Sequence, residues 1–306
     1  MRHVLSLTDF TSSEIKAVLD TAAQYKQGLR DGNRPPLLAG HTVGLLFEKP
    51  SLRTRVSFES LSSQLGGTCL FLGEDVGWGK REPICDFMPI LTSYVDLLVI
   101  RAKSHEKVCE AVEYSQCPVI NGLTDVCHPC QAFADVLTMQ EVAGDGFADC
   151  HLTYVGDANN VTYSLAVICS KLGLKMSIVA PEGYQFEKSF IEQLDRENEG
   201  GFIRQTDNIA EGVDGANFVY TDVWTSMGQE AESAQRLKDL AGFQVNGELM
   251  KLAADDVKFL HCLPARRGEE VTAEVIDSER SVIVQQANNR LHAQKGLVIW
   301  LLGEDS

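Results

Sequence analysis

Residues 47–59 read FEKPSLRTRVSFE, and this stretch decides the fold. It follows the apolar run Thr42–Phe47, which predicts a strand. Ser51 is a good N-cap, so the spacing predicts a helix that begins at about Leu52 and ends near Gly66-Gly67. Its apolar stripe is formed by Val56, Leu61 and Leu65. A strand that leads through a short loop into a helix indicates an α/β fold.

The same stretch is suited to binding an anion. The start of a helix offers free N–H groups, and this one carries Ser51, Arg53, Thr54 and Arg55 around it. Backbone donors, hydroxyls and guanidinium groups together favour a phosphate group. The alternative is an ordinary surface helix with two exposed arginines. The position directly after a strand favours the phosphate interpretation.

Composition limits the function classes. The chain has 306 residues, of which 44% are hydrophobic and 23% are charged, the balance of a globular protein of about two domains. Its net charge of -16 argues against a nucleic acid or an anionic membrane as partner. Residues 1–10 contain no apolar signal segment, and no apolar run approaches the length of a membrane span, so we expect a cytoplasmic protein. Nine cysteines without regular spacing fit a reducing compartment.

Strand and helix patterns alternate along the rest of the chain. Further strands are predicted at 68–72, 95–101, 118–121, 151–156, 176–180, 217–221, 257–260 and 281–284. Helices are predicted within 6–28, at 84–94, 132–142 and 161–172, and from Asn288 to about Leu302. A polar break at 144–149 separates two such series. We therefore expect an α/β protein with two doubly wound parallel-sheet domains joined by helices. They would comprise residues 1–143 and 150–287, with helix 288–306 packing back on the first.

The loop from Gly73 to Pro83 has too many glycines and charges for a helix or strand. Trp78 is expected to be exposed there, beside Lys80 and Arg81. An exposed tryptophan suggests a loop that closes on a ligand or contacts another subunit, but a plain connector is the open alternative.

Polar residues follow several predicted strands. Arg101 closes one strand and Asp222 follows another, at the sheet edge where α/β proteins bind ligands. Asp222 is suited to holding an ammonium group, although a turn cap is the simpler alternative. Cys262, between His261 and Leu263 at another strand exit, is a partly exposed thiol or one more buried cysteine.

A second cysteine motif spans residues 127–131, which read CHPCQ at the start of a helix. Cys127 and Cys130 have the spacing of a redox or metal pair, whereas His128 and Gln131 are suited to facing a substrate. A second ligand pair for a metal is missing from the sequence. The position late in the first domain also disfavours thiol redox chemistry.

Five motifs together resemble a known family. Residues 47–59, the His128–Gln131 segment, Asp222 with Ser226-Met227-Gly228, the segment His261–Pro264 and the segment Asn289–His292 are similar, in order and spacing, to the aspartate/ornithine carbamoyltransferases. Within the family the set looks like the members that use ornithine. The resemblance covers nearly the whole chain. It implies two α/β domains, a homotrimer, no metal and no organic cofactor.

The resemblance also implies residue roles. Carbamoyl phosphate would be held by Ser51, Leu52 through its backbone, Arg53, Thr54, Arg101, His128, Gln131, Cys262, Leu263 and Arg290. The ornithine site would comprise Asn160, Asp222, Ser226 and Met227. Among these residues, Cys262, Arg101 and His128 are the expected catalytic ones. The implied reaction carbamoylates the δ-amino group of L-ornithine to citrulline, as in arginine biosynthesis.

Two positions depart from the family pattern. Leu52 replaces a threonine, as in relatives that use acylated ornithine, and Gly77 replaces a glutamine found in many ornithine enzymes. The alternatives are therefore a carbamoyltransferase for acylated ornithine or another amine, a non-catalytic binding paralogue, and a thiol redox protein. An aspartate-specific relative would have His-Pro-Leu-Pro in place of His261–Pro264.

Overall fold

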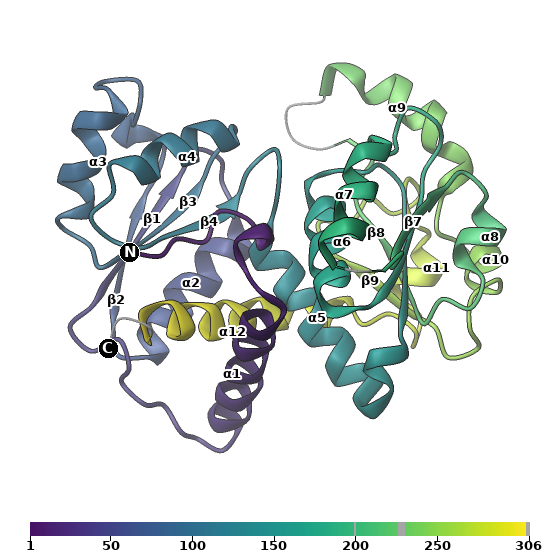
Figure 1. Ribbon diagram of the computed structural model, residues 1–306, viewed down its shortest axis with the longest axis horizontal. Coiled ribbons are helices and arrows are strands. Elements are labelled where there is room, and N and C mark those ends of the chain that lie inside the picture. Colours follow the sequence, from purple (N-terminus) through teal and green to yellow (C-terminus); the bar gives the residue numbers. More distant parts are fainter. Residues whose placement is uncertain (199, 226–229, 304–306) are drawn as a thin grey trace. The chain divides into compact units, whose positions relative to one another are not determined.

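The computed structural model describes residues 1–198, 200–225 and 230–303. The chain divides into two compact units, drawn in Figure 1. Unit 1 comprises Met1–Leu137 and the chain from Asn288 onward, and unit 2 comprises Thr138–Ala287. Two parallel-sheet α/β units confirm the predicted fold class.

Unit 1 is built on a four-stranded parallel sheet in the order β2-β1-β3-β4. The strands are β1 (Thr42–Phe47), β2 (Thr68–Leu72), β3 (Leu97–Arg101) and β4 (Val119–Leu123). The connecting helices are α2 (Leu52–Gln64), α3 (Ile84–Thr92) and α4 (His105–Glu113), and α1 (Ser12–Arg30) precedes the sheet. Figure 1 shows α3 and α4 on one face of the sheet and α2 on the other.

Unit 2 is built on a five-stranded parallel sheet in the order β7-β6-β5-β8-β9. The strands are β5 (His151–Val155), β6 (Lys175–Val179), β7 (Ile203–Thr206), β8 (Phe218–Thr221) and β9 (Lys258–His261). The helices are α6 (Asn160–Leu172), α7 (Lys188–Asn198), α8 (Ile209–Val213), α9 (Ser233–Leu240), α10 (Gly247–Met250) and α11 (Ala273–Ile276). Figure 1 shows α6 and α7 on one face of this sheet and α8 and α10 on the other.

Each sheet has a point where the strand order reverses. In unit 1 the chain proceeds from β1 to β2 on one side and later adds β3 and β4 on the other. In unit 2 it proceeds from β5 outward to β7 and then adds β8 beside β5. The carboxyl ends of the strands at such a point diverge into loops on opposite faces and leave a place for a ligand. The site residues should therefore follow β1 and β3 in unit 1, and β5 and β8 in unit 2.

Two helices run from one unit into the other. Helix α5 (Pro129–Ala143) begins in unit 1 and ends in unit 2, and α12 (Ile283–Gly303) begins in unit 2 and continues in unit 1. Within unit 1, α12 packs closely on α1, because a Cβ added at Gly296 would lie 2.6 Å from the carbonyl oxygen of Val18. Only glycine permits this approach.

The apolar cores are formed by the strands and the inner faces of the helices. In unit 1, Leu46, Met88, Ile100 and Val119 belong to one buried cluster. The corresponding cluster in unit 2 is formed by residues that include Val155, Val219 and Phe259. Among the residues described, no helix is both long and apolar enough to cross a membrane.

Most predicted elements are present, and the N-cap of α2 is confirmed. Ser51 accepts a hydrogen bond from the backbone N–H of Thr54, and the helix begins at Leu52. Two burial expectations were wrong. Val56 is 47% exposed and does not belong to the buried stripe, and Trp78 is 2% exposed because it packs into the unit 1 core.

The predicted strand at 281–284 was also wrong. Ser281 makes only an isolated bridge to Phe259, and Ile283 already begins α12, five residues before the predicted helix start at Asn288. A short apolar run does not by itself distinguish a strand from a buried helix. Strand β7 was missed, because Ile203 is its only buried residue and the rest of the strand is polar.

Candidate active site

The loop between β1 and α2 forms the centre of a cationic cluster in unit 1. Thr54, in the first turn of α2, is buried, and its Oγ1 accepts hydrogen bonds from Arg101 Nη1 at 3.4 Å and Arg290 Nη2 at 3.0 Å. Arg101 is the last residue of β3, and Arg290 lies on α12. Two buried guanidinium groups thus converge on one neutral hydroxyl at the N-terminus of a helix. Such an arrangement attracts an anion strongly.

Gln131 connects this cluster to α5. Its Oε1 accepts from Arg290 Nη1 at 2.6 Å, and its Nε2 donates to Asp135 Oδ1 at 2.7 Å. Asp135 is fully buried, one helical turn further along α5. The carboxylate orients the amide, and the amide in turn orients the guanidinium of Arg290. No sequence motif pointed to Asp135.

His128 lies directly before α5 and is buried. Burial, followed by the positive charges of Arg290 and Arg101, lowers the pKa of His128 well below 6.5. The imidazole is therefore neutral at neutral pH. A neutral imidazole can donate one hydrogen bond to a carbonyl oxygen without adding a third charge to the cluster.

Leu52 and Arg53 lie in the first turn of α2. The Leu52 side chain is 75% exposed, so only its backbone is suited to serve the loop. Arg53 is partly exposed. The cluster thus brings together Thr54, Arg101, Gln131 and Arg290 by direct hydrogen bonds, with Ser51 capping the helix.

A second cluster, in unit 2, is centred on Asp222 after β8. Asp222 Oδ1 accepts from the Cys262 thiol at 2.9 Å and from the N–H of Val223 at 2.8 Å, and its Oδ2 accepts from Asn159 Nδ2 at 3.1 Å. Of the two alternatives for Cys262, the structure shows the partly exposed thiol. Asn159 also caps α6 through the N–H groups of Val161 and Thr162. The sequence singled out Asn160, the first residue of α6, but its neighbour Asn159 makes this contact with the carboxylate.

His261 orients the segment that carries Cys262 and Leu263. Its Nε2 lies 3.1 Å from Glu270 Oε1, and its Nδ1 accepts from the N–H of Leu263 at 2.9 Å. Both side chains of the His261–Glu270 pair are fully buried. The backbone of Leu263 has a φ angle of 60°, in the left-handed region that residues other than glycine rarely adopt. The hydrogen bond to Nδ1 therefore fixes an uncommon backbone conformation beside the thiol.

Asp222, His261 and Cys262 each offer one ligand atom, and these atoms lie within 4.8 Å of one another. Both ring nitrogens of His261 are already hydrogen-bonded within unit 2. A metal ion could be coordinated by the His261 imidazole only if the hydrogen bond to Glu270 or the one from the Leu263 N–H were broken. The sequence prediction names no metal, and this group of donors gives no reason to add one.

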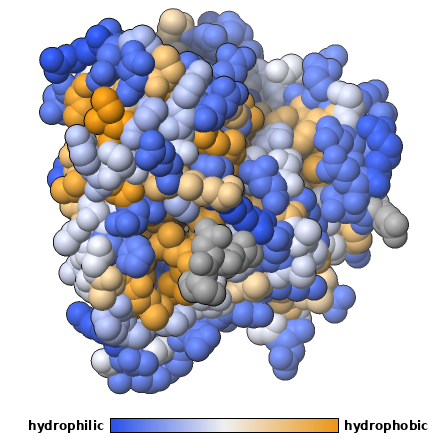
Figure 2. All heavy atoms as spheres, turned by 60° about the vertical axis from the view of Figure 1, so that its left-hand side comes forward, coloured by the Kyte–Doolittle hydropathy of each residue, from blue (hydrophilic) through white to orange (hydrophobic). Residues whose placement is uncertain are grey.

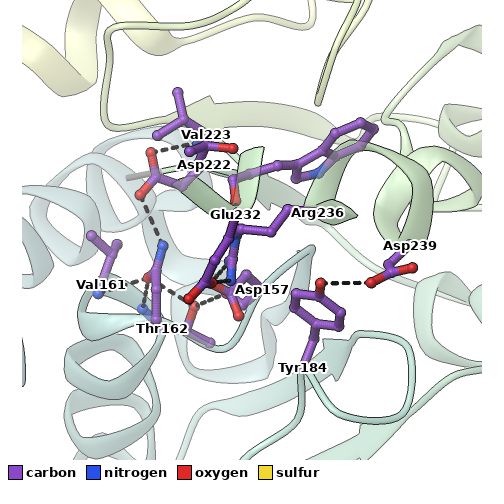
Figure 3. A network of polar contacts seen from close by, with 12 residues as sticks. Asp157, Val161, Thr162, Tyr184, Asp222, Val223, Glu232, Arg236 and Asp239 are labelled. Carbon is purple, nitrogen blue, oxygen red and sulfur yellow. Dashed lines mark hydrogen bonds and ion pairs between the residues drawn. The ribbon is translucent and has the colours of Figure 1, made fainter. Parts of the chain in front are cut away.

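An ion pair between Arg236 and Asp157 supports the second cluster, as Figure 3 shows. Arg236, on α9, also donates from Nε to the carbonyl oxygen of Trp224 at 2.5 Å and lies over the ring of Tyr184. Burial raises the pKa of Asp157 more than the guanidinium group lowers it. Trp224 follows Asp222 by two residues, and Asp157 precedes Asn159 by two. Arg236 thus joins the two chain segments that hold the Asp222 carboxylate.

Two predicted ornithine-site residues, Ser226 and Met227, lie outside the described residues. The remaining predicted residues are divided between the two units: Cys262 and Leu263 belong to unit 2, together with Asn160 and Asp222. Comparison with known protein families finds two matching domain families, which together cover nearly the whole chain. Residues 2–141 match the carbamoyl-P binding domain of aspartate/ornithine carbamoyltransferases, and residues 148–301 match their Asp/Orn binding domain. The chain belongs to the aspartate/ornithine carbamoyltransferase family.

Individual members of the aspartate/ornithine carbamoyltransferase family are similar over their full length. The ornithine carbamoyltransferase of Wolinella succinogenes is 44% identical, with 98% of each chain covered. That of Methanothermobacter thermautotrophicus is 47% identical, with 99% of this chain and 100% of the relative covered. The solved structure of the Pyrococcus furiosus ornithine carbamoyltransferase has a TM-score of 0.93 at 43% identity, covering 99% of this chain and 97% of the other.

Cys127 and Cys130 are buried in this member of the family. The Cys127 thiol lies 3.2 Å from the carbonyl oxygen of Leu5, and Cys130 Sγ lies 3.7 Å from that of Asn121. Burial raises the pKa of Cys127 to about 12 and that of Cys130 to about 11. Reactive thiols need a depressed pKa and access to solvent, so these positions disfavour the redox alternative.

Proposed function

We infer that this chain is an ornithine carbamoyltransferase, which transfers the carbamoyl group of carbamoyl phosphate to the δ-amino group of L-ornithine. The relatives that carry this name support the inference. The observation that carries it is the environment of Asp222, a largely buried carboxylate at the reversal point of the unit 2 sheet. A carboxylate there attracts the ammonium group of ornithine. Both ornithine and aspartate carry an α-ammonium and an α-carboxylate group, but the side chain of aspartate adds a second carboxylate, which Asp222 would repel.

The unit 1 cluster is the proposed carbamoyl phosphate site. Its phosphate ligands would be the N-terminus of α2 with Ser51, Leu52 through its backbone, Arg53 and Thr54. The carbamoyl oxygen would receive hydrogen bonds from Arg101 and His128, with Gln131 and Arg290 beside them. Negative charge grows on that oxygen and then on the phosphate during transfer. Fixed donors placed there stabilise the transition state more than the ground state.

The unit 2 cluster is the proposed ornithine site. Asp222 would accept hydrogen bonds from the α-ammonium group, with Asn160, Ser226 and Met227 binding the rest of the amino acid. The neutral δ-nitrogen attacks the carbamoyl carbon, and the bond from that carbon to the phosphate oxygen breaks. One proton passes from the nitrogen to the departing phosphate, so the products are citrulline and hydrogen phosphate. Cys262 and Leu263 would lie beside the attacking amine, whose neutral form a desolvated pocket favours.

We also propose a homotrimer assembled through unit 1 and a cytoplasmic role in arginine biosynthesis. Edge strand β2 exposes Leu70 and Phe71, and α2 exposes Leu52 and Val56. Figure 2 brings the left-hand side of Figure 1 forward and shows hydrophobic residues at the surface among hydrophilic ones. An apolar group of this kind on an edge strand is typical of a surface covered by another subunit.

An acylated ornithine remains the second candidate, and Leu52 is the observation that favours it. Trp78 gives this candidate no support, because its side chain is buried in the unit 1 core and is not available to a ligand.

A substrate panel tests the proposed function. Phosphate release from carbamoyl phosphate is measured with ornithine, acetylornithine, putrescine and aspartate. Acetylation removes the charge that Asp222 would bind and adds bulk, so we expect ornithine to be preferred by about 10⁴-fold. The variant Arg53→Ala is the control for phosphate release that does not depend on the site. Equal or faster turnover of acetylornithine would contradict the proposed substrate.

A further inference from the structure

The loop from Gly73 to Pro83, which joins β2 to α3, is organised around Trp78. The indole packs in the unit 1 core with Leu46, Met88 and Ile100. The neighbouring Gly77 and Gly79 have φ angles of 65° and 64°, which glycine adopts without strain. Gly77 is therefore part of a tight turn that delivers the tryptophan to the core.

Lys107 of α4 contacts Trp78 in two ways. Its Nζ donates to the Trp78 carbonyl oxygen at 3.2 Å and lies 3.8 Å from the centroid of a Trp78 ring. An ammonium group over an indole face is attracted by the ring electrons. A Cβ added at Gly79 would lie 2.9 Å from Lys107 Cε, so glycine at this position leaves room for the lysine.

The same ammonium group forms an ion pair with Glu48, the residue directly after β1. Glu48 Oε2 accepts from the N–H of Lys103 at 2.9 Å, and the Glu48 N–H donates to the carbonyl oxygen of Arg101 at 2.8 Å. Burial raises the pKa of Glu48, but hydrogen bonds from Lys107 and Lys103 lower it more, so the net shift is downward. The carboxylate is therefore held ionised between the exits of β1 and β3.

These contacts connect the loop to the proposed anion site. Glu48 precedes Ser51, the N-cap of α2, by three residues, and it is hydrogen-bonded to the backbone of Arg101. Lys107 thus links one buried tryptophan to the two strand exits that carry Ser51 and Arg101. The ammonium group of Lys107 already interacts with Glu48 and with the Trp78 ring, so Lys107 would affect a ligand only indirectly, through the position of the loop.

We propose that Lys107 is a positioning residue for carbamoyl phosphate: by clamping Trp78 to Glu48, it holds the loop 73–83 against the strand exits that carry Ser51 and Arg101. This inference rests on the proposed carbamoyl phosphate site. It also assigns Trp78 an anchoring role and no part in the choice of the amine.

The variant Lys107→Met tests the clamp, because it keeps most of the side-chain stem and removes the charge. We expect the Kd for carbamoyl phosphate, measured by calorimetry without any amine, to rise about 5- to 20-fold. The KM for ornithine should change less than about 2-fold. Lys107→Arg should restore most of the affinity. The matched control is Lys251→Met, which removes an exposed lysine paired with Glu248 in unit 2 and should leave the Kd unchanged.

A second measurement follows the loop itself. In a protein in which Trp224→Phe and Trp300→Phe leave Trp78 as the sole tryptophan, acrylamide should quench the fluorescence poorly, because Trp78 is buried. Adding Lys107→Met should increase quenching severalfold, and adding Glu48→Gln should produce a similar increase. The double variant should show little further change, since both substitutions break the same clamp.

The outcomes separate the clamp from the proposed function. Increased quenching with an unchanged Kd would overturn the inference, because the loop would then move without affecting the ligand. Unchanged quenching would overturn it too, since Lys107 would not hold the loop. A wild-type protein that binds carbamoyl phosphate but carbamoylates no amine would count against the proposed function alone. The inference about Lys107 would then still be tested by the Kd of Lys107→Met for carbamoyl phosphate.

Discussion

The Cys262 thiol lies 2.9 Å from Asp222 Oδ1, so a sulfur donor and a carboxylate from two different strand exits share one hydrogen bond. Asp222→Asn removes the charge that would bind the ammonium group of ornithine. We expect kcat/KM for ornithine to fall on the order of 10²-fold or more, because the charged group of the substrate loses its partner. The Kd for carbamoyl phosphate should change less than about 3-fold.

The control for this substitution is Asp239→Asn, which removes an exposed carboxylate that accepts from the Tyr184 hydroxyl in the same unit. Its kinetics should remain close to those of the wild type. An Asp222→Asn protein with a normal KM for ornithine would show that another group binds the ammonium.

Arg53 and Arg101 should each be required for turnover and dispensable for folding. Arg53→Ala or Arg101→Ala is expected to reduce kcat/KM about 10²- to 10³-fold, the scale for one fixed donor to a developing anion. Circular dichroism and urea unfolding check that the variants fold. Arg196→Ala, on the exposed side of α7, serves as a surface control. Near-normal turnover by a folded Arg53→Ala protein would show that Arg53 does not bind the phosphate group.

His128 should make the protein less stable in mild acid. Its pKa in the folded protein is well below 6.5, so below that pH the unfolded chain binds a proton that the folded chain does not. This contribution to stability is present above about pH 6.5 and is lost as the pH falls toward the folded-state pKa. Urea unfolding at pH 7.5 and pH 5.5 should therefore differ less in His128→Asn than in the wild type. An equal difference in both proteins would contradict the buried neutral imidazole.

The Arg236–Asp157 ion pair should contribute to stability far more than an exposed pair does. Arg236→Met leaves a largely buried carboxylate without its cation, which typically costs about 3–5 kcal/mol. Arg267→Met breaks the exposed pair with Asp277 in the same unit and should cost no more than about 1 kcal/mol. The free energies of unfolding in urea compare the two. Equal losses in the free energy of unfolding would show that burial does not increase the contribution of the Arg236–Asp157 pair to stability.

Cys127 and Cys130 should be chemically inert in the folded protein. The thiol reagent iodoacetamide should modify the exposed Cys85 first and reach the buried pair only after unfolding. Mass spectrometry of peptides locates the label. Cys127→Ser with Cys130→Ser should keep turnover within a few-fold of the wild type. Rapid labelling of either thiol in the folded protein would revive the redox alternative.

The sequence predicted the sheets where apolar runs were long and bounded by polar residues. The run before Glu48 and the strand that ends at Arg101 are of this kind, and both are buried. It failed where the pattern was ambiguous. Only Ile203 of β7 faces the core, and the apolar residues after Ser281 fit a strand and a buried helix equally well.

The site was predictable in part, for a physical reason. Parallel strands place the residues that follow them at one edge of the sheet, so Arg101 and Asp222 could be selected from their positions alone. Their supporting partners could not be selected in this way. Asp157 and Arg236 are separated by 79 residues, and neither carries a motif that signals the other. Trp78 was assigned to the surface because the loop around it is polar, whereas the fold turns the indole inward.

Helices α5 and α12 carry Gln131 and Arg290, and these two residues are hydrogen-bonded to each other within unit 1. The anion cluster therefore combines the first half of the chain with its last helix. On the ribosome, Ser51, Thr54 and Arg101 emerge early, but the guanidinium group of Arg290 is added only when α12 has been synthesised. A nascent chain that has completed the first sheet therefore still lacks one of the guanidinium groups of the anion cluster.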